Sequence, residues 1–238
     1  MIASEFEYRH RFGMMAAVFL FAYAFYNLDH SNVVWEIVSW NTGLLDKKLI
    51  VRLVYTAATV LAGVGAAIGT WAAAYRQSHN CRGQSEKIAF SMGGPFRYVR
   101  NPHFLGYFLL LVGLGTFQSR LGFPVFLLGE TMLILRLITR EEMRLDQQYG
   151  ERFRDYRHRV SRLWPSLRPQ IAREVQLPHW RQAFVDQAFQ WGLVATLAAF
   201  AVTLSDPVGY GIALIALLGL ALQKLYRNFW IRTGVSVL

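Results

Sequence analysis

Long apolar blocks separated by short polar segments dominate the chain. Six blocks are apolar enough to predict membrane spans, at residues 12–28, 53–75, 103–117, 123–137, 188–204 and 208–225. A helix needs roughly 20 apolar residues, at about 1.5 Å of rise each, to cross a bilayer. Blocks 103–117 and 123–137 are shorter and share the turn 118–122, so we predict a helical hairpin there. The expected fold is an all-α, polytopic membrane bundle of about six transmembrane helices.

The order of the blocks predicts three regions. Residues 1–48 supply an N-terminal span and an outer interfacial segment, and residues 49–169 form the core with a basic, amphipathic segment after its last span. Residues 170–238 supply an interfacial helix and a transmembrane hairpin. In the second block, glycines at the spacing Gly65-x-x-x-Gly69 favour close packing of helices, as do Gly113 and Gly115 in the third.

The basic excess is unevenly distributed. The chain has 25 Lys and Arg against 15 Asp and Glu, a net charge of +10. Most of the arginines flank the spans on alternate sides, and ten of them fall between residues 136 and 173. The positive-inside rule therefore predicts cytoplasmic termini and cytoplasmic basic segments. This pattern favours contact with membrane lipids over nucleic acid, and we expect no metal site. Cys81 has no partner for a disulfide.

The stretch 93–106 combines glycines, prolines and arginines before an apolar block. Proline disfavours helix in the residue before it, so Gly94 and Asn101 are expected to be extended and a helix to begin near Pro102 with Asn101 as its N-cap. The free N–H groups of that helix, together with Arg97 and Arg100, predict an anion site. An ordinary capped helix with interfacial arginines explains the same pattern equally well.

A second polar stretch ends the fourth block. Arg136, Arg140 and Arg144 repeat every four residues, which places three like charges on one helical face at a cost of a few tenths of a kcal/mol per pair. Glu141 and Glu142 lie beside them, and carboxylates near a bilayer need partners. Either these carboxylates pair with the arginines, or the stretch binds a ligand.

The segment 145–164 has its aromatic and apolar residues at helical spacing, with a basic opposite face. Such an amphipathic helix is typical of a membrane surface, where it would act as a lid or brace. Pro165 and Pro169 are expected to end it.

Three motifs in this order carry a resemblance to a known family: the stretch 93–106, then Arg140-Glu141-Glu142, then the segment from Tyr149-Gly150-Glu151 to Pro165. With them, residues 49–165, about half of the chain, resemble the isoprenylcysteine carboxyl methyltransferase and phospholipid methyltransferase superfamily. The resemblance implies an S-adenosylmethionine-dependent enzyme built from membrane helices, with a cofactor pocket at the cytoplasmic face. It also implies a lipophilic small molecule or prenylated substrate, methylated on an isoprenylcysteine-like carboxylate or a lipid headgroup.

The resemblance also assigns residues. The cofactor-binding residues it implies, together with the flanking positions of the same motifs, are Arg97, Tyr98, Arg100, Asn101, Pro102, His103, Phe104, Leu105, Gly106, Glu141 and Glu142. Arg140 is expected to orient a substrate anion in catalysis, and a headgroup phosphate would satisfy it equally well.

Two departures from the family pattern matter. Asn101 stands where the family has histidine, and Phe104 where it has tyrosine, so an imidazole and a phenol hydroxyl are missing. Asparagine still forms hydrogen bonds and phenylalanine still stacks on adenine, so cofactor binding is less affected than base catalysis. Two alternatives remain open: an NADPH-dependent, sterol-reductase-like membrane enzyme, whose tail resembles residues 141–165, and a non-catalytic membrane scaffold with a degenerate pocket.

Overall fold

A computed structural model of the protein describes residues 2–40, 43, 46–76, 90–172, 177–205, 211, 214, 218 and 219. Within these residues the fold is helical, and the sole β-type contact is one isolated bridge between Asn32 and Ser119. The helices are α1 (Glu5–Arg9), α2 (Arg11–Tyr23), α3 (Val33–Ser39), α4 (Lys47–Tyr75), α5 (Pro102–Leu114), α6 (Gly122–Tyr149), α7 (Glu151–Arg159), α8 (Trp180–Asp186) and α9 (Ala188–Thr203), with 3-10 turns η1 (Ala24–Asn27), η2 (Gly94–Arg97) and η3 (Gly115–Phe117). Most of the predicted span 208–225, and Cys81, lie outside the described residues.

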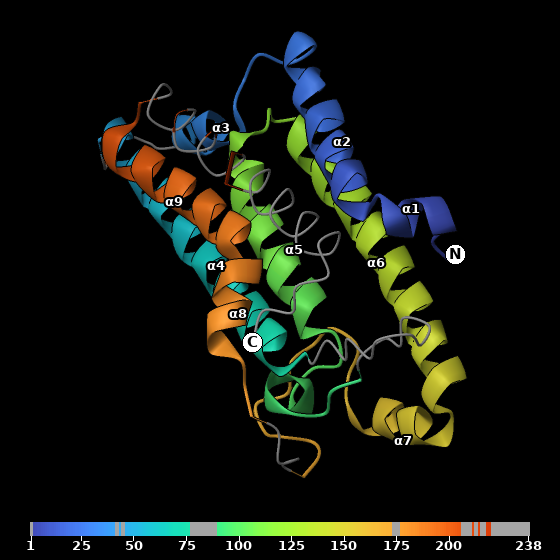
Figure 1. The fold of residues 1–238 in the computed structure, drawn as a ribbon. Helices are drawn as coiled ribbons and strands as arrows, with labels where there is room; N and C mark the ends of the chain where they lie inside the picture. The colour runs from blue at the N-terminus through green and yellow to red at the C-terminus, as the bar shows by residue number, and fades with distance from the viewer. Residues whose placement is uncertain are drawn as a thin grey trace.

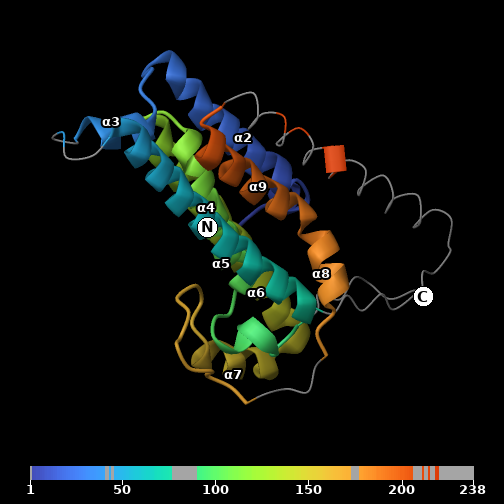
Figure 2. The ribbon, with the colours of Figure 1, turned by 90° about the vertical axis from the view of Figure 1, so that its left-hand side faces the viewer.

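Two helices are long and apolar enough to cross a membrane. They are α4, with 29 residues, and α6, with 28. The pair α8 and α9 qualifies as a third if it is counted as one span, but it bends by 62° at Gln187 (Figure 2). The predicted span 12–28 is divided between α2 and η1, and α5 with η3 is a shorter apolar helix. The described residues therefore contain two or three candidate spans.

The bundle has two sides (Figure 1). Helices α4, α5 and α9 pack together on one side, and α2 packs along α6 on the other. The approach of α4 to α5 is very close at glycines: a Cβ atom on Gly106 would lie 2.8 Å from the backbone nitrogen of Gly69, and one on Gly65 would lie 2.8 Å from that of Leu110. The prediction that Gly65 and Gly69 serve helix packing is confirmed, and Gly106, predicted to bind the cofactor, is their packing partner on α5.

The predicted hairpin also forms, but its second arm is longer than expected. The chain reverses between η3 and α6, where Arg120 forms an ion pair of 3.3 Å with Asp29 and Asn32 donates a hydrogen bond of 3.1 Å to the carbonyl of Thr116. Helix α6 then continues to Tyr149, 12 residues beyond the predicted end at 137. The mostly polar segment 138–149 thus prolongs the helix past the apolar block.

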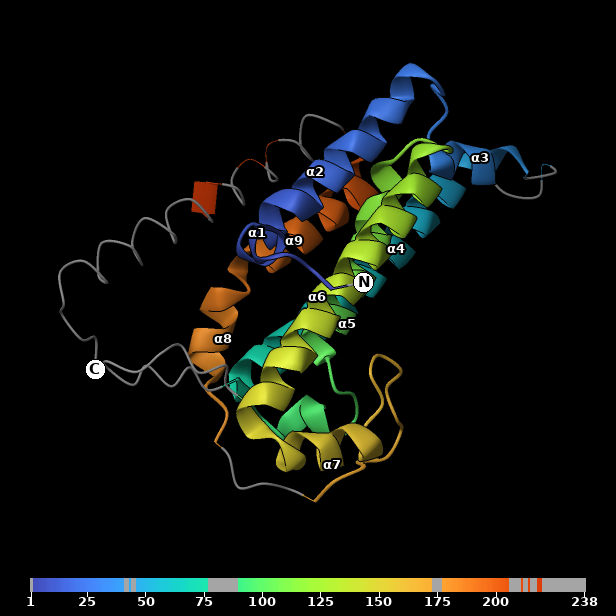
Figure 3. The ribbon, with the colours of Figure 1, turned by 90° about the vertical axis from the view of Figure 1, so that its right-hand side faces the viewer.

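The amphipathic segment does not form one surface helix. Gly150 has φ +53°, which breaks the segment into the end of α6 and the short helix α7 lying across that end (Figure 3). The aromatic face of α7 is covered by protein: Phe153, Tyr156 and Val160 are buried against Phe90. This face therefore contacts protein, and the placement of the segment at the membrane surface as a lid or brace stays a prediction. The helix ends at Arg159, before either proline.

Candidate functional site

The polar motifs meet at the end of the bundle where α7 crosses. A cleft there, with free volume of about 40 Å³, lies between the start of α5, the last turns of α6, the segment 90–96 and α7. Its lining residues are Arg76, Phe90, Ser91, Phe96, Arg100, Asn101, Pro102, His103, Phe104, Glu141, Glu142, Leu145, Phe153 and Tyr156. A volume of this size accommodates a few water molecules, since one needs roughly 10 to 15 Å³.

The backbone before α5 differs in part from the prediction. Helix α5 does begin at Pro102, but Gly94 has φ +52° and is not extended. The ring of Tyr75 lies against Gly94, and a Cβ atom there would come within 2.8 Å of ring atoms. Only glycine combines that φ with that contact, so Gly94 lets the chain turn tightly against α4 before it enters the cleft.

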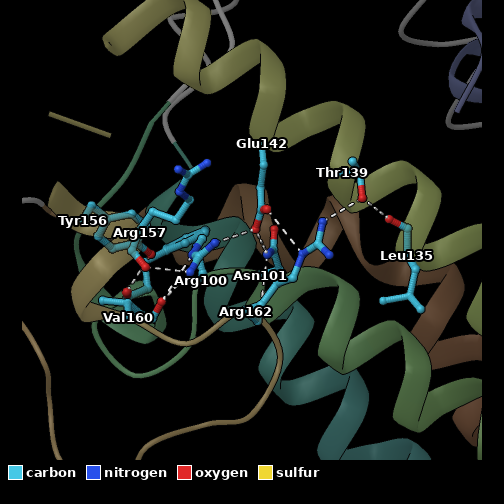
Figure 4. A network of polar contacts seen from close by, with 10 residues as sticks. Arg100, Asn101, Leu135, Thr139, Glu142, Tyr156, Arg157, Val160 and Arg162 are labelled. Atoms are coloured by element: carbon cyan, nitrogen blue, oxygen red, sulfur yellow. Dashed lines mark hydrogen bonds and ion pairs between the residues drawn. The ribbon is translucent and has the colours of Figure 1, made fainter. Parts of the chain in front are cut away.

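Glu142 is the centre of the polar network in the cleft (Figure 4). Its Oε1 accepts hydrogen bonds from Arg100 Nη1 at 3.1 Å and from Asn101 Nδ2 at 2.9 Å. Its Oε2 lies 3.2 Å from Arg162 Nε. Asn101 is the N-cap residue of α5, as predicted, but its side chain makes no capping hydrogen bond. Its amide instead donates to Glu142 and to the carbonyl of Arg162.

Arg100 joins three segments at this point. Besides Glu142, its guanidinium donates hydrogen bonds to the carbonyls of Arg157 at 2.7 Å and Val160 at 2.8 Å. The side chains of Arg100 and Glu142 are 11% and 12% exposed. Charged hydrogen bonds are strong when they are shielded from water in this way, so Arg100 fixes the end of α7 to the start of α5.

A second pair lies at the rim of the same cleft. Glu141 forms an ion pair with Arg76, which follows the last residue of α4. The Arg76 side chain is 38% exposed, so this pair is more accessible to water than the pair at Glu142. The cleft thus presents two guanidinium groups and two carboxylates.

The three arginines of α6 have other partners than we predicted. Arg136 pairs with Glu7 at 2.8 Å, and Arg140 and Arg144 both pair with Glu5. These carboxylates belong to α1, so Glu141 and Glu142 do not compensate the arginine row. Arg140 also donates to the carbonyl of Ala3 and does not line the cleft.

Four of the predicted cofactor residues also lie outside the cleft lining. Arg97 donates a hydrogen bond of 3.1 Å to the carbonyl of Ile171, and the carbonyl of Tyr98 accepts one from the backbone of Ser166. Gly106 packs against α4, and Leu105 is its neighbour on α5. The structure does bring together Arg100, Asn101, Pro102, His103, Phe104, Glu141 and Glu142.

Aromatic side chains form the apolar wall of the cleft. The ring of Phe90 lies 5.2 Å from that of Tyr156 and 5.6 Å from that of Phe153, measured between centroids. Burial raises the pKa of Tyr156 above its usual range, with Glu142 adding to the rise and Arg100 opposing it. The phenol therefore stays protonated at neutral pH and donates a hydrogen bond of 2.8 Å to the carbonyl of Phe96.

One lining residue has unused hydrogen-bonding capacity. His103 Nδ1 is buried and has no hydrogen-bond partner among the described residues. Buried polar atoms are nearly always paired, so an unpaired nitrogen at a cleft is a feature that a bound molecule can satisfy.

Sequence reasoning missed several residues of this region. Arg76 directly follows a predicted span and Arg162 lies in the basic segment, but nothing in their spacing indicates Glu141 and Glu142 as partners. Glu130 could have been noticed from the sequence, because a single carboxylate in the middle of a predicted span is rare and usually functional. It is fully buried in α6.

Comparison with known proteins adds no relative. No family model, curated protein or solved structure matches this chain. The resemblance to the methyltransferase superfamily thus depends on its three motifs alone, and it stays a prediction.

Proposed function

We propose that the protein is an S-adenosylmethionine-dependent methyltransferase of the membrane, with its cofactor in the cleft at the end of α5 and α6. One observation carries the proposal: two arginine–glutamate pairs and an unpaired buried histidine nitrogen face a single aromatic-walled cleft. Residues from all three motifs that suggested the family line this cleft, although the first two motifs are about 40 positions apart in the chain.

The chemistry of the cleft fits this cofactor. S-adenosylmethionine carries a carboxylate, an ammonium group, ribose hydroxyls and an adenine ring. Arg76 and Arg100 would bind the carboxylate, and Glu141 and Glu142 would bind the ammonium or the ribose. Phe104 and Phe90 offer faces for adenine, and His103 Nδ1 offers one further hydrogen bond. When bound, the cofactor supplies an electrophilic methyl group on its sulfonium.

The cleft is too small to hold the cofactor in the geometry seen here. Small-molecule sites usually enclose roughly 300 to 1,000 Å³, whereas the free volume here is about 40 Å³. Binding therefore requires the lining side chains to separate, and the two ion pairs are the contacts that would open. Each arginine and glutamate would then exchange its partner in the protein for an opposite charge on the cofactor.

The residues of the chain contribute positioning and exclusion of water. Methyl transfer is an in-line displacement, so holding the acceptor against the methyl group supplies much of the acceleration. An acceptor that is an isoprenylcysteine-like carboxylate needs no base, and the aromatic wall keeps water out. Arg140 lies outside the cleft, so in this scheme it binds a lipid or substrate anion at the surface of α6.

The membrane arrangement is part of the proposal. We propose six spans, with both termini, α7 and the cleft on the cytoplasmic side, and a lipophilic substrate that enters from the bilayer. The supporting observation is the sequence pattern: basic residues are concentrated around the cleft and α7, as the positive-inside rule requires of the cytoplasmic face.

Calorimetric titration of the detergent-purified protein tests the function. S-adenosylhomocysteine should bind with micromolar affinity, and Glu141→Gln should weaken binding about tenfold, the loss expected for one charged hydrogen bond. Glu151→Gln is the matched control, because Glu151 is exposed on α7. Binding of NADPH alone would favour the reductase alternative, and binding of neither molecule would favour the scaffold.

A further inference from the structure

Arginines from two parts of the chain gather where α1 meets α6 (Figure 1). The guanidinium carbon of Arg11 lies 5.1 Å from the centroid of the Tyr8 ring. Those of Arg140 and Arg144 lie 5.5 Å and 4.5 Å from the same centroid. Arg136 is one helical turn before Arg140 on α6, so it lies on the same face. We call these four arginines the arginine cluster.

The carboxylates of α1 compensate this cluster only in part. Glu5 is shared by two of the arginines, and Glu7 pairs with a third. The fourth, Arg11, donates a hydrogen bond to a backbone carbonyl and has no carboxylate partner among the described residues. With two carboxylates for four guanidinium groups, the cluster keeps an excess of two positive charges, which attracts anions.

The cluster also has unused hydrogen-bonding capacity. The Nε atoms of Arg136 and Arg140 are buried and have no partner in the part of the chain that the structure describes. The Glu5 side chain is 59% exposed, so a competing anion can reach the carboxylate that two arginines share. A phosphate has more acceptor oxygens than a carboxylate, and arginine binds it through two N–H groups at once. A phosphate would therefore satisfy more of the cluster than Glu5 does.

The surroundings of the cluster favour a lipid as the source of that phosphate. Phe6 on α1 and Phe12 on α2 are 65% and 54% exposed, and Met143 on α6 is 42% exposed. The guanidinium carbon of Arg11 lies 5.0 Å from the centroid of the Phe12 ring. Exposed apolar side chains beside arginines are typical of a membrane interface, where acyl chains contact the first and headgroup phosphates the second. A free phosphate would leave these apolar side chains in water.

We propose that the arginine cluster is a binding site for the phosphate of an anionic lipid, which takes the place of the Glu5 carboxylate. Docking of α1 on α6 and binding of the lipid then exclude each other. The inference extends the role given to Arg140 above to a whole site. It depends on the membrane placement of this face and on no step of methyl transfer, because the cluster lies outside the cleft lining.

Calorimetric titration of the detergent-purified full chain, without cofactor, tests the site. Dihexanoyl phosphatidic acid should bind at least about tenfold more tightly than inorganic phosphate or dihexanoyl phosphatidylcholine. Arg140→Gln should weaken its binding about tenfold, the loss expected for one charged hydrogen bond. Arg154→Gln is the matched control, since Arg154 is an exposed arginine of α7 with a carboxylate partner. Equal binding of inorganic phosphate would overturn the lipid assignment, and equal affinities in the two variants would overturn the site.

Glu5→Gln tests the displacement, because its effect should have the opposite sign. Removal of the competing carboxylate should tighten binding of dihexanoyl phosphatidic acid several-fold, which a loss of folding cannot do. Glu151→Gln removes the same charge from an exposed position on α7 and should leave the affinity unchanged. In wild type, the amides of α1 should exchange faster when this lipid is bound. Unaltered affinity in Glu5→Gln would overturn the exclusion between the lipid and α1.

Discussion

The two faces of α6 near its polar end hold opposite arrangements of charge. On the cleft face, Glu142 of α6 forms ion pairs with Arg100, which lies just before α5, and with Arg162, which follows α7. On the other face, Arg136 and Arg144 of α6 form ion pairs with the carboxylates of Glu7 and Glu5 in α1. The glutamate is 12% exposed on the first face, but Glu5 is 59% exposed on the second.

This difference separates two roles for ion pairs. Pairs shielded from water and tied to backbone carbonyls hold distant segments in one geometry, and losing one partner leaves a buried charge uncompensated. Exposed pairs contribute little and are screened by salt. The cleft face is thus built to fix a site, whereas the α1 face attaches one terminus to the bundle.

The largest effect is expected from Glu142→Gln. This change removes the carboxylate that accepts hydrogen bonds from Arg100 and Asn101 and forms an ion pair with Arg162, while keeping the side-chain size. We expect a loss of about 3 kcal/mol in the free energy of unfolding, measured by detergent denaturation in mixed micelles. Glu151→Gln is the control and should change it little. Equal stabilities for the two variants would remove Glu142 from the centre of the network.

A smaller effect should follow from Arg100→Lys. Lysine keeps the charge near Glu142 but cannot reproduce the planar fork that also bonds the carbonyls of Arg157 and Val160. We expect a loss of about 1 to 2 kcal/mol and faster amide exchange in α7. Arg154→Lys, at the exposed pair with Asp146, is the matched control. Unaltered exchange in α7 would show that those carbonyl contacts do not hold the helix.

On the opposite face, Glu5→Gln should have a weaker effect. Exposed pairs are typically worth about 0.2 to 1 kcal/mol, so we expect global stability to fall by no more than about 1 kcal/mol. At low salt, the amides of α1 should be less protected from exchange in Glu5→Gln than in wild type. At high salt, where charges are screened, wild type should lose this protection as well. If neither the substitution nor high salt alters the amide protection of α1, the contact of Ala3 and the apolar contacts alone hold the N-terminal segment on the bundle.

The smallest effect is a local pH dependence of α1. A hydrogen bond from the Ser4 backbone, with Arg136 adding attraction, holds the pKa of Glu7 below its usual range. A carboxyl with a lowered pKa stabilises the folded state above its ordinary pKa, and that stabilisation is lost as the pH falls through the lowered value. Amide exchange of α1 should therefore rise in acid, and Glu7→Gln should abolish this dependence. A persistent acid transition in that variant would assign it to another group.

Much of the fold could be predicted because its signals are local. Apolar block length indicated helices, the glycine spacing in block 53–75 indicated a close helix contact, and the proline at 102 marked the first residue of α5. The errors came where a local signal competed with distant residues. Asn101 is a good N-cap type, yet its side chain makes no capping bond and donates to Glu142, and Gly150 divides the predicted amphipathic helix in two.

The candidate site was predictable only in outline. Sequence reasoning brought the 93–106 and 141–142 motifs to one face, and the structure places seven of the predicted residues in one cleft. It could not place Arg97, which bonds the carbonyl of Ile171, or Arg140, which bonds α1. Residue type and spacing give a side chain its chemistry, but neither identifies which surface it will meet.

The sequence by itself determined the helical character, the apolar blocks and the supply of arginines and carboxylates, because these follow from residue type and from spacing within one or two turns. Only the tertiary structure decided the pairing. Arg100 meets Glu142 across 42 positions and Arg140 meets Glu5 across 135, distances over which no periodicity extends. It also decided that Glu130 is fully buried, since burial depends on every helix packed around that position.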